Sequence, residues 1–334
     1  MNSLDLFTSS LENQNILIVG DVMVDAYLFG SVSRISPEAP VPVVAVERRE
    51  RRLGGAANVA FNVRSMGAHP VICSVLGNDD ESKEFLHIMY QHDMDKRGIV
   101  TSDDRITTVK TRILGNQMQM LRVDEEITSP LSPADEQALI ERVDRILKTM
   151  PISAVIFQDY DKGCLTPAVI DHVTELARRK KIITTVDPKH RNFRHFHDVT
   201  LFKPNLKELK EGLDIEVDDT TRESLQADLD RAALTLHERQ RIDIVLITLS
   251  AKGVYLCDFR GEKPVSAIIP ARLRAVSDVS GAGDTVISVI TLALAAGLPA
   301  EEAVRYANLA GGIVCEEVGV VPINKERLLS ELAQ

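Results

Sequence analysis

Short apolar runs alternate with longer segments of mixed polarity along most of the chain. The first run, 16–20, is bounded by turn residues and is typical of a buried parallel strand. Further runs of this kind predict strands at 70–76, 154–157, 182–186 and 244–248, and helices are predicted at 79–92, 132–148, 166–180 and 300–316. This alternation indicates an α/β fold, with a mainly parallel sheet covered on both faces by helices.

Two segments depart from the alternation. Residues 27–48 contain Pro37, Pro40 and Pro42 among several valines, which excludes a helix and favours extended structure. Residues 108–114 and 117–123 flank Gly115-Asn116 and predict a β-hairpin with a two-residue turn. Near the end, 254–257 and 265–269 predict further strands, and we expect them to be antiparallel at the edge of the sheet.

Composition narrows the class of protein. The 334 residues are 44% hydrophobic, enough for one large α/β domain or two smaller ones. A net charge of −10 argues against a nucleic-acid surface. We find no signal peptide in the first 14 residues and no apolar run long enough to span a bilayer, so we expect a cytoplasmic protein without a membrane partner. The cysteines are far apart among apolar neighbours, and we expect buried free thiols at Cys73, Cys164, Cys257 and Cys315.

The strongest candidate for chemistry is Gly281-Ala282-Gly283-Asp284, which precedes the apolar run 286–296. Glycines let backbone amides approach a ligand closely, and the N-terminus of a helix attracts phosphate. A carboxylate beside an anion site makes sense as the base that takes a proton from a hydroxyl attacking a phosphoryl group. The alternative is that Asp284 only caps the helix.

Other polar residues follow the predicted strands. Asn205 and Glu208 lie three apart, and their oxygens suit a hydrated Mg²⁺ ion held with nucleotide phosphates; the alternative is an ordinary helix cap. Asp25 suits sugar hydroxyls or is a solvated loop acid, and Asn58 suits a sugar hydroxyl or is a polar residue on a helix face. Strand ends are also polar at 159–163, 187–189 and 203–205.

Two basic residues, Lys110 and Arg112, project from one face of the predicted hairpin. They suit a phosphate carried by the substrate, or they protect an edge strand from aggregation. His190, His195 and His197 have no cysteine near them, so we interpret them as part of a surface loop rather than a metal site.

These motifs together resemble those of the ribokinase (PfkB) family of sugar kinases, over nearly the whole chain. The resemblance is carried by Gly-Gly-Ala-Ala-Asn at 54–58, Asn-Leu-Lys-Glu at 205–208 and Asp-Val-Ser-Gly-Ala-Gly-Asp at 278–284. Within the family, the motifs at 20–25, 33–43, 159–163 and 278–285 look most like those of the kinases that act on heptose 7-phosphate, which are often fused to a nucleotidyltransferase domain.

The resemblance implies a ribokinase-like three-layer αβα fold with a small β-sheet lid. It implies one kinase domain over 1–334, lid segments at about 27–48 and 106–124, no nucleotidyltransferase domain in these residues, and a homodimer formed through the lid. ATP and Mg²⁺ are the implied cofactors, with a monovalent cation as a further candidate.

The same resemblance implies roles for individual residues. Asp284 matches the catalytic base, and the backbone of Gly281, Ala282 and Gly283 matches an anion hole. Asn205 and Glu208 match the pair that organises Mg·ATP, and the resemblance implies that they do so through water. Ser250, Gly253 and Asn308 fall where the family holds the nucleotide. The positions that fall with the sugar substrate are Asp25, Gly55, Asn58, Lys110, Arg112 and Lys162.

The hypothesis is therefore transfer of a phosphoryl group from ATP to the anomeric hydroxyl of a heptose 7-phosphate. The rivals are a kinase for another phosphorylated sugar, such as fructose phosphate, and a non-catalytic regulator that binds nucleotide or sugar phosphate. A dinucleotide-dependent dehydrogenase is poorly supported, because no Gly-x-Gly-x-x-Gly follows the first strand.

Overall fold

The centre of the fold is a nine-stranded sheet, seen in a computed structural model that describes residues 2–116, 118–272 and 274–334. Its order is β13-β12-β11-β10-β9-β8-β1-β4-β5, parallel from β11 to β5 and antiparallel for β12 and β13 at one edge. The strands are β1 (Asn15–Gly20), β4 (His69–Gly77), β5 (Ile99–Ser102), β8 (Ala154–Gln158), β9 (Ile183–Asp187), β10 (Leu201–Phe202), β11 (Ile244–Thr248), β12 (Val254–Asp258) and β13 (Val265–Ile269).

Helices cover both faces of this sheet. Successive side chains of a strand point to opposite faces, so Ile16 and Ile18 pack into one core and Leu17 and Val19 into the other. The first core is covered by α1 (Ser3–Ser10), α2 (Ala56–Ser65), α3 (Asp80–Gln91), α8 (Ala282–Ala295), α9 (Ala300–Val314) and α10 (Lys325–Leu332). The second is covered by α4 (Pro133–Thr149), α5 (Pro167–Lys180), α6 (Leu206–Leu213) and α7 (Arg222–Gln240). The predicted three-layer α/β fold is confirmed.

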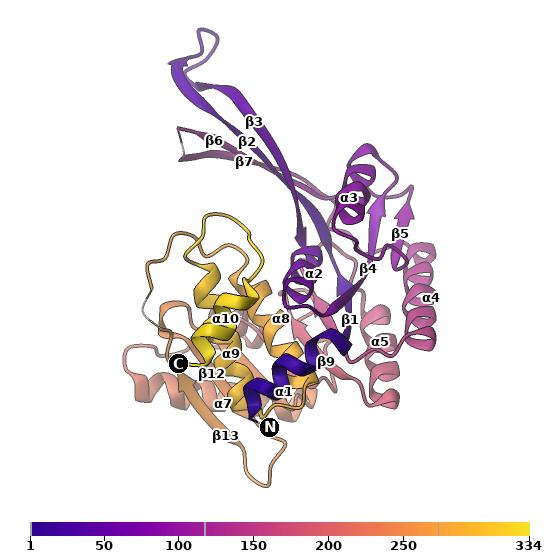
Figure 1. Ribbon diagram of the computed structural model, residues 1–334, viewed down its shortest axis with the longest axis vertical. Helices are drawn as coiled ribbons and strands as arrows, with labels where there is room; N and C mark the ends of the chain where they lie inside the picture. The colour runs from indigo at the N-terminus through magenta and orange to yellow at the C-terminus, as the bar shows by residue number, and fades with distance from the viewer. Residues whose placement is uncertain (1, 117, 273) are drawn as a thin grey trace.

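A second sheet of four strands projects from this body, and we call it the small sheet (Figure 1). Its order is β3-β2-β6-β7, from β2 (Val22–Ile35), β3 (Pro42–Gly55), β6 (Val109–Gly115) and β7 (Met118–Glu125). The predicted hairpin is β6 and β7, which pair antiparallel; Gln117 of that prediction lies outside the described residues. Because β6 lies between β2 and β7, the interpretation of Lys110 and Arg112 as protection of an edge strand is wrong.

The parallel strands bring distant polar residues to one edge. Strand β1 lies between β4 and β8, and the chain leaves it first toward β4 and later returns on the β8 side. In open α/β sheets, ligands bind outside the carboxyl ends of the strands at such a switch point. Gln158 and Asp187 end β8 and β9, and Lys203 follows β10.

Some details differ from the sequence-based expectations. Cys73, Cys164 and Cys257 are buried free thiols, whereas Cys315 is half-buried because it follows the last turn of α9. His190 and His195 are exposed in turns and His197 is half-buried. Among the residues that the structure describes, no helix is long and apolar enough to cross a membrane.

Candidate active site

Asp284 lies in the first turn of α8, whose N-cap residue is Gly281 with a φ of 81°. The side chain is only 5% exposed. Its carboxylate accepts hydrogen bonds from side chains of three other positions, so in the described residues it joins α8 to the sheet and to α2 instead of capping its own helix.

Those three donors hold both carboxylate oxygens. Asn58 Nδ2 donates to Oδ2 at 2.7 Å, while Tyr160 Oη and Gln158 Nε2 donate to Oδ1 at 2.7 and 3.0 Å. Burial raises the pKa of Asp284 to about 6; the Asn58 hydrogen bond lowers it and the nearby Asp187 carboxylate raises it. A buried carboxyl with a pKa near neutrality is suited to accept a proton.

Polar side chains lie close to the turn before α8. A Cβ atom at Gly281 would lie 3.2 Å from Asn58 Nδ2 and, at Gly283, 3.6 Å from Lys203 Nζ. Lys203 Nζ pairs with Asp187 Oδ2 at 2.9 Å, and both side chains are buried. The amides at the start of α8 and a buried ammonium group therefore lie beside these glycines, and this combination favours binding of a phosphate.

Asn205 and Glu208 form a capping box at the start of α6. Asn205 Oδ1 accepts from the Glu208 amide and Glu208 Oε2 accepts from the Asn205 amide, both at 2.8 Å. Glu208 Oε1 also pairs with Lys189. The interpretation as a helix cap is thus confirmed for these oxygens. Because the cap already occupies them, they would reach a ligand only through a bridging water molecule or after the side chains move.

No group of three His, Cys, Asp or Glu residues that could hold a metal ion by itself occurs in the described chain. The oxygen atoms of Asn205 and Glu208 are of the type that Mg²⁺ accepts through its water ligands. The donor set therefore fits a hydrated ion shared with nucleotide phosphates.

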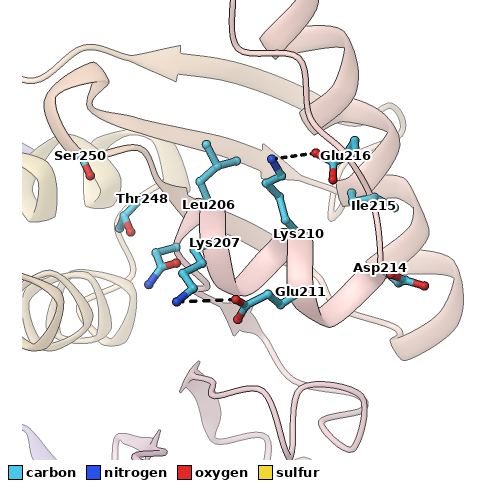
Figure 2. A pocket seen from close by; sticks show the side chains of 10 residues that line it. Leu206, Lys207, Lys210, Glu211, Asp214, Ile215, Glu216, Thr248 and Ser250 are labelled. Carbon is cyan, nitrogen blue, oxygen red and sulfur yellow. Dashed lines mark ion pairs between the residues drawn. The ribbon is translucent and has the colours of Figure 1, made fainter.

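A hollow of about 900 Å³ adjoins Asn205 and is lined by α6, Thr248 and Ser250 (Figure 2). Its volume lies within the range of small-molecule sites. Lys207 and Lys210 line it and pair with Glu211 and Glu216 at 3.7 and 3.0 Å. The hollow does not include Asp284, which is covered by its hydrogen-bond donors.

The other predicted nucleotide residues lie in nearby turns and on α9. Gly253 has a φ of 97° and closes the turn between β11 and β12, where a Cβ atom would lie 2.1 Å from Ile269 O. This glycine is required by the backbone. Asn308 Nδ2 donates to Pro270 O at 2.9 Å and is half-buried, so it joins α9 to the segment after β13.

The basic residues that were predicted to contact the substrate are paired with carboxylates. Arg112 pairs with the buried Asp25, so Asp25 is not a solvated loop acid. Lys110 and Lys162 meet at Glu126, at 3.0 and 2.8 Å. The structure thus brings Lys110 and Lys162 together from separate segments, whereas Arg112 lies against Asp25 instead.

Gly55 has a backbone reason to be glycine. Its φ is 63°, and a Cβ atom there would lie 2.4 Å from the backbone oxygen of Asp21. Gly55 is the N-cap of α2, the helix that carries Asn58. It therefore contributes to the site by allowing α2 to begin against the end of β1.

Comparison with known proteins settles the family. The model of the pfkB family of carbohydrate kinases matches residues 13–327. The chain belongs to this family. It is a sugar kinase, and the predicted resemblance is confirmed.

The chain is similar to longer relatives in this family. It is 41% identical over 317 residues to the bifunctional protein HldE of Methylobacillus flagellatus, and 37% identical over 314 residues to that of Wolinella succinogenes. These matches cover 95% and 94% of the chain, which spans 63% and 64% of the length of the two relatives.

Solved structures of pfkB-type kinases share the fold. Phosphofructokinase-2 from Escherichia coli superposes with a TM-score of 0.75 at 17% identity, covering 96% of this chain and 99% of that one. Arabidopsis thaliana ribokinase, complexed with ribose and ATP, gives a TM-score of 0.67 at 16% identity, covering 95% and 98%. At these identities the likeness concerns the fold.

Sequence reasoning about this pfkB kinase assigned no role to Gln158, Asp187, Lys189 or Lys203. Each lies at or just after the end of a parallel strand, and this position was the signal in the sequence that could have indicated a role. Their partners are far away in the chain; Gln158 and Asp284 are 126 residues apart. Only the strand order brings them together.

Proposed function

We propose that this kinase transfers the γ-phosphoryl group of ATP to the anomeric 1-hydroxyl of D-glycero-β-D-manno-heptose 7-phosphate, giving the 1,7-bisphosphate. The product would serve the synthesis of ADP-heptose for the lipopolysaccharide core. The motifs at 20–25, 33–43 and 159–163 support the sugar, and the similarity to proteins named HldE agrees with it.

The observation that carries the proposal is the buried Asp284 carboxylate at the N-terminus of α8, beside Gly281 and Gly283. In the proposed reaction, Asp284 takes the proton of the sugar hydroxyl while the sugar oxygen attacks the phosphorus. The amides of Gly281, Ala282 and Gly283 stabilise the charge on the transferring group. Asn58, which bonds Asp284, lies beside the attacking hydroxyl.

The distal phosphate of the sugar is assigned to Lys110 and Lys162. Both ammonium groups bond Glu126, and they come from β6 and from the loop after β8. A phosphate provides more acceptor oxygens than one carboxylate and displaces Glu126 in this proposal. Asp25 orients sugar hydroxyls and is itself oriented by Arg112.

The nucleotide is assigned to the hollow beside Asn205 and Ser250, with Gly253 and Asn308 in the adjoining turns. Asn205 and Glu208 would hold Mg²⁺ through its water ligands, and the ion would supply shielding of the phosphate charges. A monovalent cation is a further candidate, since phosphofructokinase-2 from Escherichia coli, which has the same fold, was solved in complex with potassium.

The testing experiment is ADP release by the purified protein with Mg·ATP. Heptose 7-phosphate and fructose 6-phosphate are compared, and the Asp284→Asn variant runs in parallel. We expect turnover with the heptose alone, and a loss of about 10²–10⁴-fold in the variant.

Each other outcome changes a defined part of the proposal. Turnover with fructose 6-phosphate instead keeps the assignment as a kinase and rules out the heptose as the substrate. Near-full activity of Asp284→Asn rules out Asp284 as the catalytic base. Binding of ATP without turnover on either sugar favours a regulator that binds nucleotide.

A further inference from the structure

The loop after β8 holds Tyr160 in a fixed place. The carboxylate of Asp21, at the end of β1, accepts hydrogen bonds from the amides of Tyr160, Lys162 and Cys164 at 2.8, 3.1 and 2.9 Å. Asp21 is only 3% exposed, so water does not compete for these amides. The role of Asp21 is therefore to fold this loop, which then presents the Tyr160 phenol to α8.

The two oxygens of Asp284 are occupied unequally. Oδ1 accepts from Tyr160 Oη and from Gln158 Nε2, whereas Oδ2 accepts from Asn58 Nδ2 among the described residues. A carboxylate oxygen has two lone pairs for hydrogen bonds. Oδ1 is thus filled, and Oδ2 keeps one lone pair for a further donor.

We propose that Tyr160 is a positioning residue for phosphoryl transfer, which with Gln158 fills Oδ1 of Asp284 so that Oδ2 receives the proton of the sugar hydroxyl. The inference rests on the proposed role of Asp284 as the base. In the step, the O–H bond of the sugar breaks, its proton passes to Oδ2, the sugar oxygen bonds the γ-phosphorus, and ADP leaves.

Tyr160 remains the donor in this pair. Burial and the charge of Asp284 raise the pKa of the phenol well above its ordinary value, so the proton stays on Tyr160. The hydrogen bond favours the ionised form of Asp284 and lowers its pKa against the effect of burial. Removing the phenol hydroxyl therefore makes Asp284 harder to ionise.

Other charged groups around the pair come from neighbouring elements. Asp187 on β9 faces Asp284 and is paired with Lys203, which follows β10. Lys189 Nζ lies 5.7 Å from the centre of the Tyr160 ring and pairs with Glu208. Although burial opposes it, Asp187 and Glu208 raise the pKa of Lys189, so Lys189 stays a cation.

Asp25 also faces Tyr160, and it is paired with Arg112. These ion pairs remain in place when only the Tyr160 hydroxyl is removed. A change in the pH dependence of such a variant therefore reports the hydrogen bond to Asp284.

The test is the pH profile of kcat/KM for Tyr160→Phe. We expect its acidic limb to move up by about one pH unit, the worth of one hydrogen bond to a buried charge. Activity at pH 6 then falls by about fivefold relative to the native protein, while activity near pH 8.5 is largely recovered. Gln158→Met removes the other donor to Oδ1 and moves the limb in the same direction. It also removes the hydrogen bond from Gln158 Nε2 to Asp187 Oδ2 at 3.3 Å, so Tyr160→Phe is the cleaner of the two variants.

A matched control is Tyr255→Phe. Tyr255 Oη donates to Asp230 Oδ1 at 2.7 Å, the same pairing of phenol and carboxylate, between β12 and α7. This variant leaves the limb in place.

The outcomes separate this inference from the proposed function. If Asp284→Asn is inactive but neither Tyr160→Phe nor Gln158→Met moves the limb, the role of Tyr160 is overturned and the kinase proposal stands. A rate lowered equally at every pH also overturns it, because that indicates a structural role alone. If Asp284→Asn keeps its activity, the base and the inference fail together.

Discussion

At the scale of single residues, the proposed phosphoryl transfer depends on the ionisation state of one carboxylate. Asp284 is buried, which opposes ionisation, and it is surrounded by donors, which favour it. The balance leaves its pKa at about 6. A base of this kind is mostly ionised at neutral pH and still accepts a proton in the transition state.

The pH dependence of the native protein follows from this balance. Asp284 acts only when ionised, so kcat/KM should rise with pH up to about 6 and then level off. The measurement is initial rates of ADP release from pH 5 to 8.5 at subsaturating sugar. A profile that stays flat down to pH 5 contradicts the assignment of Asp284 as the base.

The same carboxylate affects stability. Its pKa in the folded state is above the ordinary value of 3.8, so the folded protein binds the extra proton between these values. The contribution is fully present below pH 3.8 and is lost as pH rises through about 6. Over that window the loss amounts to about 3 kcal/mol.

Asp284→Asn has no such titration. Its free energy of unfolding should therefore rise relative to that of the native protein as pH goes from 4 to 7, while its activity stays low. Denaturant unfolding of both proteins at several pH values measures this. A constant difference across the range shows that Asp284 is not buried as a charge.

Lys110 tests the site for the distal phosphate. Lys110→Met should raise KM for the sugar phosphate by about tenfold or more and change kcat little, because it removes a charged donor remote from the reacting atoms. Lys83→Met is the control; Lys83 is exposed on α3 and pairs with Asp80. An unchanged KM for Lys110→Met excludes it from the site.

At the scale of elements, the sequence is informative where a local rule applies. The apolar run after Asp284 and the Gly-Gly pair before Asn58 predict helices, and α8 and α2 are there. The glycine of this pair that begins α2, Gly55, has the positive φ that favours glycine. Local chemistry thus predicts where most elements begin.

Elements with a weak local pattern are missed. No element is predicted over 222–240, where α7 lies, because two of its six buried residues are alanines, a third is Gln240, and the apolar Leu234 lies on the exposed face. The partners of Asp284 are missed for a different reason, since they follow from strand order rather than from local sequence. The resemblance to a family predicts the base, but not Gln158 or Lys203 beside it.

The capping box of α6 provides a test at this scale. Asn205→Ala should cost about 1 kcal/mol of stability through the lost cap, and it should also weaken ATP binding. Asn2 caps α1 with the same type of capping box and does not line the hollow. Asn2→Ala should cost a similar amount and leave ATP binding unchanged. Equal ATP affinity in both variants limits Asn205 to a structural role.

At the scale of the whole molecule, the small sheet exposes many apolar side chains. They come from β2, β3, β7 and the segment between β2 and β3, and they are Ile35, Val41, Val46, Met118, Met120, Leu121 and Val123. Every described residue of β7 is exposed. The small sheet projects from the body of the molecule (Figure 1). Exposed apolar patches on such a sheet mark contact surfaces, so we propose a homodimer formed through it.

A charge on this surface tests the dimer. Leu121→Asp should shift the protein toward monomer in analytical ultracentrifugation, because a dimer contact would bury the new carboxylate. Val265→Asp is the control, since Val265 is 63% exposed on β13, away from the small sheet. A native protein that is monomeric at all concentrations removes the proposal.

The position of the new phosphate on the product decides whether the anomeric hydroxyl is the acceptor. Heptose 7-phosphate is incubated with Mg·ATP and the native protein, and the product is followed by phosphorus NMR. Transfer to the anomeric hydroxyl gives a second phosphate resonance that is coupled to the anomeric proton, and this resonance is absent with Asp284→Asn. A product that carries the new phosphate on another hydroxyl, or no product at all, contradicts it.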